Sequence, residues 1–259
     1  MEISDAKKKE LLVFALGLAD KSRALITEKM SSGFKIGEKD DGSLVTEVDR
    51  GVEELLRKEI EGKYPEHGIW GEEFGKVRED AEYQWILDPI DGTIAFTHGL
   101  PFFGTLIGLE KDGESLLGVV DLPGLGRRYW ASVGEGAFVN GQKFEIGSCD
   151  DVEAELIAVC DRLCFKRAGA DEGWQRIMED NDRVRNVSDC AAHMLAAQGS
   201  FGALVDYDLN KYDIAAIKPI VEEAGGVWQV QAREVEGVTK YDVICGKKEC
   251  VQWCAERFN

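Results

Sequence analysis

The segment that most constrains the fold is an apolar strand that runs directly into a pair of aspartates. Residues 83–87 form a short apolar run, and Asp88-Pro89-Ile90-Asp91-Gly92-Thr93 follows without a break. Proline disfavours helical geometry in the residue before it, so Asp88 takes an extended or turn conformation. Two carboxylates around a rigid proline can converge on one hard cation such as Mg²⁺, which prefers oxygen ligands. The segment predicts a strand that ends in a cation site, although Asp-Pro and Asp-Gly are also common turn pairs.

The residues after the second aspartate suit a phosphate group. Gly92 lets the backbone approach a ligand closely. If Thr93 opens a helical turn, the free N–H groups of Gly92 and Thr93 can bind a phosphate oxygen.

The chain divides into two halves with different patterns, and it is predicted to be an α/β protein. The first half is predicted to be α+β, with helices and antiparallel strands at 4–30, 49–60, 69–70, 83–87, 103–110, 116–121 and 128–132. Asp49 is the expected cap of the second helix. The second half is predicted to be alternating α/β, at 156–160, 172–178, 191–198, 203–205, 214–224, 227–231, 243–245 and 247–257. We expect two subdomains, over 1–146 and 147–259.

Charge and cysteine content limit the classes of function. The 259 residues hold 31 Lys and Arg against 49 Asp and Glu, for a net charge of −18. Such a chain repels nucleic acid and anionic membranes and attracts metal cations, although an acidic surface also serves solubility alone. No apolar run approaches the roughly 20 residues of a spanning helix, and no signal-peptide core is present, so a cytoplasmic protein is expected. The seven cysteines include no Cys-x-x-Cys pair and are expected to be reduced, partly buried thiols.

Four ordered motifs resemble those of the inositol monophosphatase superfamily of Mg²⁺-dependent, lithium-sensitive phosphatases. They are Ser43-Leu44-Val45-Thr46 with Asp49, then Gly71-Glu72-Glu73, the segment 85–93, and Tyr212-Asp213-Ile214-Ala215-Ala216 followed by Glu223-Ala224-Gly225-Gly226. The resemblance covers about residues 5–255. It implies a layered α/β/α/β/α fold of the sugar-phosphatase type, and a homodimer, because the family is commonly dimeric.

The resemblance also implies a role for each residue that matches a family motif. The first metal would be held by Glu72, Asp88 and the carbonyl of Ile90, the second by Asp88, Asp91 and Asp213, and a third, weaker metal through waters by Glu72. Asp49 and Thr93 would orient the attacking water. Phosphate hydrolysis by a metal-activated water would then require two or three Mg²⁺ ions per site. Residues 1–146 would carry most of the metal ligands, and 147–259 the distal aspartate and the leaving-group pocket.

Two departures from inositol-type members resemble the histidinol-phosphatase branch. They are Ser188-Asp189-Cys190, in place of a small Gly-Thr-Ala run, and Lys211-Tyr212 before the distal aspartate. Asp206 stands where the family contacts the leaving group with a glutamate, and Asp189 would line the same pocket. Two extra carboxylates suit a cationic leaving group, which predicts L-histidinol phosphate as the substrate and a role in histidine biosynthesis. Asp189 as a helix cap and Asp206 as a surface carboxylate are the plain alternatives. The predicted substrate contacts are Asp91, Gly92, Thr93, Ser188, Asp189, Cys190, Asp206 and Asp213.

Other functions stay open at this point. Within the family, an inositol-1-phosphate or broad sugar phosphatase that also acts on fructose 1,6-bisphosphate is the alternative, and a nucleotide 3′-phosphatase is a weaker one. A phospho-ligand binder without turnover would need a missing catalytic group, and Asp49, Glu72 and Thr93 are all present. His193 is expected to be packed on an apolar helix, and His98 to lie in a loop near the site.

Overall fold

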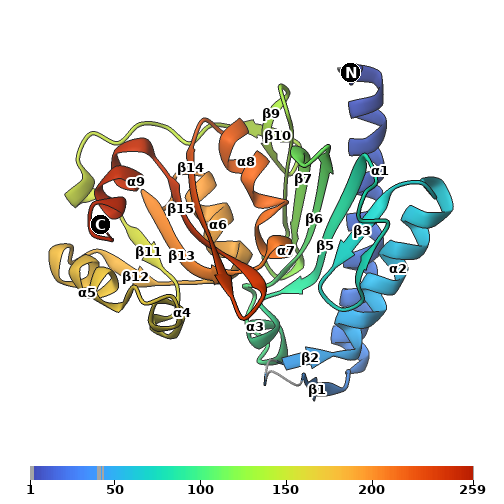
Figure 1. The fold of residues 1–259 in the computed structure, drawn as a ribbon, viewed down its shortest axis with the longest axis horizontal. Helices are drawn as coiled ribbons and strands as arrows, with labels where there is room; N and C mark the ends of the chain where they lie inside the picture. The colour runs from blue at the N-terminus through green and yellow to red at the C-terminus, as the bar shows by residue number, and fades with distance from the viewer. Residues whose placement is uncertain (1–2, 40–41, 43, 259) are drawn as a thin grey trace.

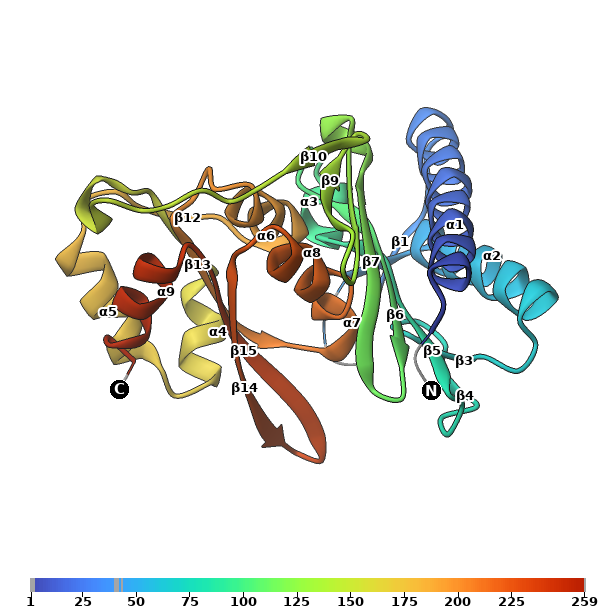
Figure 2. The same ribbon diagram turned by 90° about the horizontal axis from the view of Figure 1, so that it is seen from above.

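Helices and sheets alternate in five layers, which confirms the layered α/β/α/β/α fold (Figures 1 and 2). The computed structural model describes residues 3–39, 42 and 44–258. The first helical layer holds α1 (Asp5–Ser32) and α2 (Glu47–Lys63). The middle layer holds α6 (Asp189–Ala197), α7 (Lys211–Ile214) and α8 (Ile217–Glu223). The last layer holds α4 (Arg162–Arg167), α5 (Asp171–Asp180) and α9 (Lys248–Ala255), and a short helix, α3 (Thr93–Thr97), lies at one end of the first sheet.

The larger sheet lies between the first two helical layers. Among the described residues it has eight strands, in the spatial order β10 (Gln142–Phe144), β9 (Gly136–Val139), β8 (Arg127–Ser132), β7 (Glu114–Leu122), β6 (Gly104–Lys111), β5 (Tyr83–Asp91), β3 (Gly68–Gly71) and β4 (Gly75–Val77). All neighbours are antiparallel except β3 and β5, which are parallel. Helices cover both faces, so β5 is a nearly continuous apolar run, buried from Trp85 to Ile90.

The smaller sheet is mixed rather than purely parallel. In the described chain its five strands run in the order β12 (Val184–Asn186), β11 (Ile157–Val159), β13 (Ala203–Leu209), β15 (Val238–Gly246) and β14 (Val227–Val235). The first three are parallel, but β14 and β15 form an antiparallel hairpin. The hairpin closes at Glu236-Gly237, where both residues have positive φ (52° and 82°), as two-residue turns between twisted strands require. Two further strands, β1 (Ile36–Glu38) and β2 (Leu44–Thr46), pair beside α2.

Three hydrophobic clusters fill the spaces between the layers. One packs α1 and α2 on the larger sheet, one lies between the two sheets around α6 and α8, and one packs α4, α5 and α9 on the smaller sheet. The middle cluster joins Leu106 and Val120 of the larger sheet to Leu204 and Val243 of the smaller one. The two sheets therefore share one core, and the division into subdomains at 146/147 stays a prediction.

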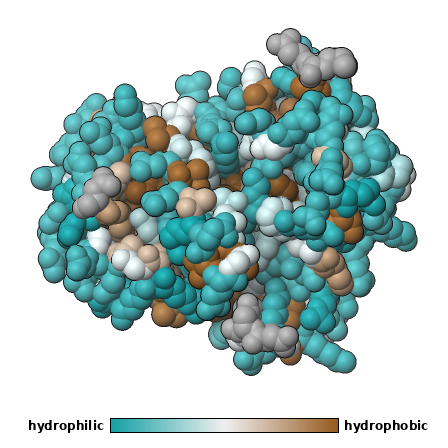
Figure 3. Space-filling model, viewed as in Figure 1, coloured by the Kyte–Doolittle hydropathy of each residue, from teal (hydrophilic) through white to brown (hydrophobic). Residues whose placement is uncertain are grey.

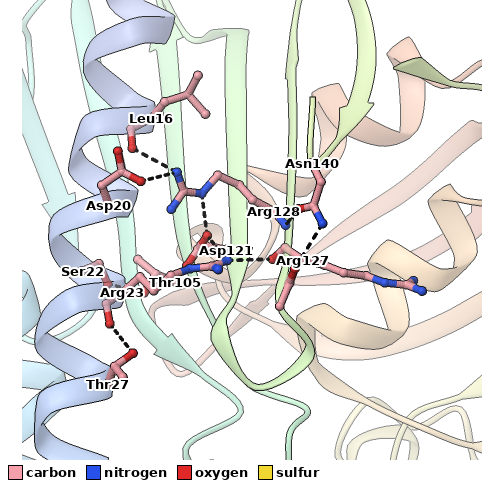
Figure 4. Close-up of polar contacts among 11 residues, drawn as sticks. Leu16, Asp20, Ser22, Arg23, Thr27, Thr105, Asp121, Arg127, Arg128 and Asn140 are labelled. Carbon is pink, nitrogen blue, oxygen red and sulfur yellow. Dashed lines mark hydrogen bonds and ion pairs between the residues drawn. The ribbon is translucent and has the colours of Figure 1, made fainter. Parts of the chain in front are cut away.

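A buried carboxylate ties α1 to the larger sheet (Figure 4). Asp121 of β7 is fully buried, and both of its oxygens accept hydrogen bonds from Arg23 of α1, at 2.7 and 2.9 Å. Arg128 of β8 donates to the same carboxylate at 2.6 Å and to Asp20 of α1 at 2.6 Å. Two guanidinium groups thus compensate one buried charge, which fixes the position of α1 along the sheet.

Several predicted boundaries are wrong in informative ways. The second helix begins at Glu47, not Asp49, because the Thr46 side chain caps it and Asp49 is the third residue of a capping box. The predicted helix 214–224 is broken into α7 and α8 at Ala215 and Ala216. The sequence analysis also did not predict β1, β4, α3, α4 and β12, which are short and lack a clear hydrophobic period.

The residues between α7 and α8, Ala215 and Ala216, contact the larger sheet at two glycines. Gly108 of β6 and Gly118 of β7 face each other across the strand pair. A Cβ atom at Gly118 would lie 1.9 Å from the Ala216 carbonyl oxygen, and one at Gly108 would lie 3.0 Å from Ala215. The backbone of the middle layer therefore rests directly on the sheet, where no other residue type fits.

The molecular surface agrees with the acidic composition. The face seen in Figure 3 is mainly hydrophilic, with hydrophobic residues scattered among polar ones. None of the helices in the described ranges combines the length and the apolar character needed to cross a membrane.

The glycine contact generates a stability prediction. We expect Gly118→Ala to lower the free energy of unfolding by about 2–4 kcal/mol, because the new methyl group overlaps backbone that cannot move freely. Urea unfolding followed by circular dichroism measures the change. Gly17→Ala is the control, because Gly17 lies in α1 with nothing within 4 Å of the added Cβ. That variant should be ~0.5–1 kcal/mol more stable than the wild type. Equal stabilities for Gly118→Ala and wild type would contradict the contact.

Candidate metal and phosphate site

A β-bulge turns Asp88 and Asp91 toward the same side of the sheet. In the pairing of β5 with β6, Asp88 stands opposite Leu106 and Asp91 opposite Gly104, so β5 has one residue more than β6 over this stretch. In a regular strand, residues three apart point to opposite faces, and the extra residue cancels that alternation. Pro89 lies within the bulge, where its missing N–H costs no ladder bond.

Asp213 lies on α7 in the middle helical layer and completes a cluster of three carboxylates with Asp88 and Asp91. Its side chain accepts hydrogen bonds from the Asn210 backbone N–H at 2.6 Å and side-chain amide at 3.2 Å, which form the capping box of α7. One oxygen each of Asp88, Asp91 and Asp213 lies within 4.8 Å of the others. The predicted ligands of the second metal are thus brought together.

The three carboxyl groups are poorly compensated by the described protein. Burial, followed by repulsion from Glu72 and Asp91, holds the pKa of Asp88 well above its usual range, and burial does the same for Asp91. Burial raises the pKa of Asp213 to about 6. Asp88 Oδ1 is buried and accepts no hydrogen bond from any described residue. Converging oxygens with an unsatisfied lone pair fit a hard divalent cation, which supplies the missing charge.

Glu72 lies at the edge of this cluster, and its neighbour is a lysine. Lys39 Nζ is 2.8 Å from Glu72 Oε1 and 2.6 Å from Glu73 Oε1. Burial raises the pKa of Glu72 to about 7, against the opposing effect of Lys39. Its predicted role as a ligand of further metals stays a prediction.

A buried glutamate shapes the Gly71-Glu72-Glu73 loop. Glu53 of α2 is fully buried, and its carboxylate accepts the backbone N–H groups of Glu73 at 2.7 Å and Phe74 at 3.2 Å. A Cβ at Gly71 would lie 1.9 Å from Glu53 Oε1. The glycine of this motif therefore makes room for Glu53. The importance of Glu53 was not predicted from sequence, because α2 contains several other glutamates.

Asp49 and Thr93 face each other as the resemblance implies. Thr93 Oγ1 donates to the Ile90 carbonyl at 3.0 Å and lies 3.4 Å from Asp49 Oδ1. The other oxygen of Asp49 accepts the Thr46 backbone N–H at 2.8 Å and also the Thr46 hydroxyl. Burial raises the pKa of Asp49. Ser43, which begins the same motif, lies outside the described residues.

Gly92 has the conformation and the space that only glycine tolerates. Its φ of 81° is left-handed, and an added Cβ would lie 2.7 Å from the Phe102 carbonyl oxygen. It forms the N-cap of α3, so the first N–H groups of that helix follow directly on Asp91.

Two cavities that share part of their lining lie beside these residues. The larger, of about 550 Å³, is lined by Glu72 and Thr93 and by hydrophobic side chains of Leu44, Ile94, Leu100 and Phe102. The smaller, of about 150 Å³, reaches Asp91 and Asp213. Three residues line both cavities: Asp161, Ser188 and Asp189. Asp161 follows an apolar strand just as Asp88 does, a signal that sequence analysis passed over.

The predicted leaving-group residues do not all face the cavities in the same way. Asp189 has a φ of 66° and stands beside Gly92, and it is not the α6 cap, since Ser188 holds that position. Burial raises the pKa of Asp189 to about 6. Cys190, a predicted substrate contact, is buried in the core between the sheets, and both its thiol and its backbone N–H bind Asp91.

Asp206 lines the smaller cavity, where the resemblance implies a leaving-group contact, and it is paired within the protein. It is a buried residue of β13, not a surface carboxylate, and its Oδ2 is 3.0 Å from His193 Nε2. His193 is buried as predicted. Although burial opposes it, the hydrogen bond that His193 donates to Asp206 raises the His193 pKa to about 10. Asp206 thus lines the smaller cavity as half of an ion pair. His98 is exposed at the end of α3, and all seven cysteines, which lie in the described part, are free thiols.

Comparison with known proteins identifies the class and the family. The model of the Inositol monophosphatase family matches residues 7–257. A histidinol-phosphatase of Chlorobaculum parvum is 38% identical over 216 residues, 83% of each chain. A fructose-1,6-bisphosphatase/inositol-1-monophosphatase of Aquifex aeolicus is 31% identical over 229 residues, 82% of this chain and 81% of that one. A solved inositol monophosphatase from Zymomonas mobilis shares 29% identity and a TM-score of 0.82, covering 96% of this chain and 98% of that one.

These likenesses agree with the buried carboxylates and the cavity beside them. The chain is a phosphoric monoester hydrolase. It belongs to the inositol monophosphatase family, as the four sequence motifs predicted.

The crowding of carboxyl groups predicts that the free energy of unfolding of the metal-free protein falls as pH rises above about 4. A carboxyl whose pKa is raised by folding binds more protons in the folded state, so its contribution to stability falls as pH rises. For Asp213 this loss falls between about pH 4, its ordinary value, and about pH 6. In EDTA at pH 7.5, Asp213→Asn should therefore be ~1–3 kcal/mol more stable than wild type, and the gain should disappear near pH 4.

Urea unfolding at several pH values measures this difference. Asp150→Asn, a change at an exposed carboxylate, is the control and should show no gain at either pH. If the wild type is as stable as Asp213→Asn at pH 7.5, the crowded carboxyl groups do not destabilise the metal-free protein and the prediction is wrong.

Proposed function

We propose that the protein is a Mg²⁺-dependent phosphatase for an ester with a cationic leaving group, with L-histidinol phosphate as its substrate. One observation carries the proposal. Besides the predicted metal ligands Asp91 and Asp213, four acidic side chains line the smaller cavity. Asp161 and Asp189 form no ion pair with any described lysine, arginine or histidine, whereas Asp206 and Asp208 each have a cationic partner. Asp161 and Asp189 thus give the cavity wall a negative charge that a ligand can neutralise.

Asp208 is one of the carboxylates that the protein itself neutralises. Arg233, from the β14–β15 hairpin, lies 3.2 Å from Asp208 Oδ1 and 2.5 Å from Asp242 Oδ2. Asp208 is thereby neutralised within the protein, as Asp206 is by His193. Asp161 and Asp189 have no such compensation among the described residues, and the raised pKa of Asp189 reflects its burial and its closeness to Asp206.

Histidinol carries an ammonium and an imidazole group, and both can complement two carboxylates. Inositol is neutral and gains nothing from them. The second phosphate of fructose 1,6-bisphosphate would meet Asp161 and Asp189 as like charges, which disfavours that substrate. Inositol 1-phosphate is the second candidate, since the solved relative from Zymomonas mobilis is an inositol monophosphatase.

The residues present fit a metal-assisted hydrolysis. Asp88, Asp91 and Asp213 would hold one Mg²⁺, and Glu72, Asp88 and the Ile90 carbonyl a second, with a third near Glu72. When bound, Mg²⁺ lowers the pKa of water and offsets the charge of the phosphoryl oxygens. The N–H groups of Gly92 and Thr93 at the start of α3 would bind a phosphate oxygen.

Thr93 and Asp49 would move the proton of the attacking water. As the water attacks phosphorus, its proton would pass to Thr93 Oγ1. The Thr93 hydroxyl would turn from the Ile90 carbonyl and give its own proton to Asp49 Oδ1, 3.4 Å away. The Thr46 groups hold the other Asp49 oxygen, which keeps the accepting oxygen turned toward Thr93. A place in histidine biosynthesis, a cytoplasmic location and a homodimer belong to the same proposal.

Metal removal tests the first half of the proposal. EDTA-treated protein should lose at least ~100-fold in phosphate release, and added Mg²⁺ should restore it, because the crowded carboxyl groups alone repel phosphate. Asp213→Asn should stay inactive after Mg²⁺ is added. Activity that survives complete removal of metal would refute the mechanism.

Substrate choice tests the second half. With L-histidinol phosphate, inositol 1-phosphate, fructose 1,6-bisphosphate and 3′-phosphoadenosine 5′-phosphate, we expect a preference of about 100-fold in kcat/KM for the first, equivalent to about 2.7 kcal/mol. Asp161→Asn and Asp189→Asn should each raise KM for histidinol phosphate by ~10-fold, since each removes a charge-assisted contact, and should leave KM for inositol phosphate nearly unchanged.

Asp150→Asn, an exposed carboxylate away from both cavities, serves as the control for charge alone. Equal effects of Asp189→Asn on cationic and neutral substrates would contradict the role given to the two carboxylates and leave the metal chemistry intact.

A further inference from the structure

A chain of three buried oxygens connects α1 to the bulge that carries Asp88 and Asp91. Ser22 Oγ of α1 lies 2.6 Å from Thr105 Oγ1 of β6, and Thr105 Oγ1 lies 2.9 Å from the Pro89 carbonyl oxygen of β5. Both hydroxyl residues are fully buried. They lie beside the Asp121 cluster at the contact between α1 and the sheet (Figure 4).

Counting hydrogens fixes the direction of this chain. A carbonyl oxygen can only accept, so the single hydroxyl hydrogen of Thr105 points to Pro89. Thr105 Oγ1 must then accept from Ser22, whose hydroxyl is the donor. Helix α1 is therefore linked to the bulge by two hydrogen bonds that pass through Thr105.

The bulge needs such a partner because it lacks ladder bonds. The strand register gives neither Pro89 nor Ile90 a residue opposite on β6. Each of their carbonyl groups instead accepts from a threonine hydroxyl, Pro89 from Thr105 and Ile90 from Thr93. Thr93 belongs to the proposed reaction, whereas Thr105 lies on the far side of the strand, out of reach of the cavities.

We propose that Thr105, held by Ser22, is a positioning residue that fixes the bulge so that the Asp88 and Asp91 carboxylates face the same ion. The inference rests on the proposed metal site. Without the Thr105 hydroxyl, the buried Pro89 carbonyl has no partner, and the bulge relaxes to find one. Because Asp88 and Asp91 flank Pro89 and Ile90, any such rotation separates their carboxylates.

The test is the affinity for Mn²⁺, measured by titration calorimetry on the full chain after metal removal. Thr105→Val keeps the shape of the side chain and removes the hydroxyl, and it should raise the Mn²⁺ Kd by ~10-fold or more, the usual effect of losing a group that orients metal ligands. Thr105→Ser restores the hydroxyl and should return the Kd to near the wild-type value. Ser22→Ala should weaken binding to a lesser degree.

Ser132→Ala is the matched control, because Ser132 is a buried serine on the same sheet whose hydroxyl has no partner among the described residues. It should leave the Kd unchanged. Urea unfolding of each variant in EDTA separates a general loss of stability from a loss of metal affinity.

Two results would overturn the inference in distinguishable ways. If Thr105→Val lowers stability but binds Mn²⁺ as the wild type does, Thr105 is merely structural and the metal site stands. If the wild type itself binds no Mn²⁺, the proposed metal site fails and the inference fails with it.

Discussion

Direct backbone contact between the middle helical layer and the larger sheet is the constraint on which the site depends. Ala215 and Ala216 lie against Gly108 and Gly118 so closely that a single methyl group would separate them. Asp213 stands two residues before this contact, and its partners Asp88 and Asp91 lie on β5, the strand next to β6. A side chain at either glycine would push α7 outward and withdraw the third carboxylate. The cluster of three carboxylates therefore depends on a contact that contains no charged group.

The chain treats its buried acids in two distinct ways. Asp121, Glu53, Asp206 and Asp242 each have an arginine or histidine within 3.0 Å, so the protein supplies their counter-charge. Asp88, Asp91 and Asp213 crowd one another, and within the described residues none forms an ion pair. Three acids that crowd one another without a cationic partner mark the place where an external cation belongs. Around the smaller cavity, Asp206 and Asp208 likewise have a cationic partner, whereas Asp161 and Asp189 have none among the described residues.

Much of the site could be predicted from sequence because its motifs are local. Asp88 to Thr93 are consecutive, and proline and glycine in that stretch have conformations that a reader can anticipate. The bulge itself was not visible, since it arises from pairing with β6, and neither were the partners of buried groups. Asp206 looked available for substrate, but His193, on another element, already binds it. Thr105 was missed for the same reason, because its importance comes from tertiary neighbours and not from local pattern, whereas Asp161 follows an apolar strand and could have been found.

The two walls of the cavity come from different parts of the fold, and this separation bears on how such enzymes diversify. Glu72 and Thr93 lie on one wall of the larger cavity, while Asp161, Ser188 and Asp189 stand on the connections that lead into α4 and α6. Those connections carry none of the three clustered carboxylates, although the Cys190 backbone N–H binds Asp91. A change of the Asp161 or Asp189 side chain would therefore alter the wall that faces the alcohol and leave the carboxylates of β5 in the chain. Relatives of this chain that carry different substrate names are what such a division of labour would leave behind.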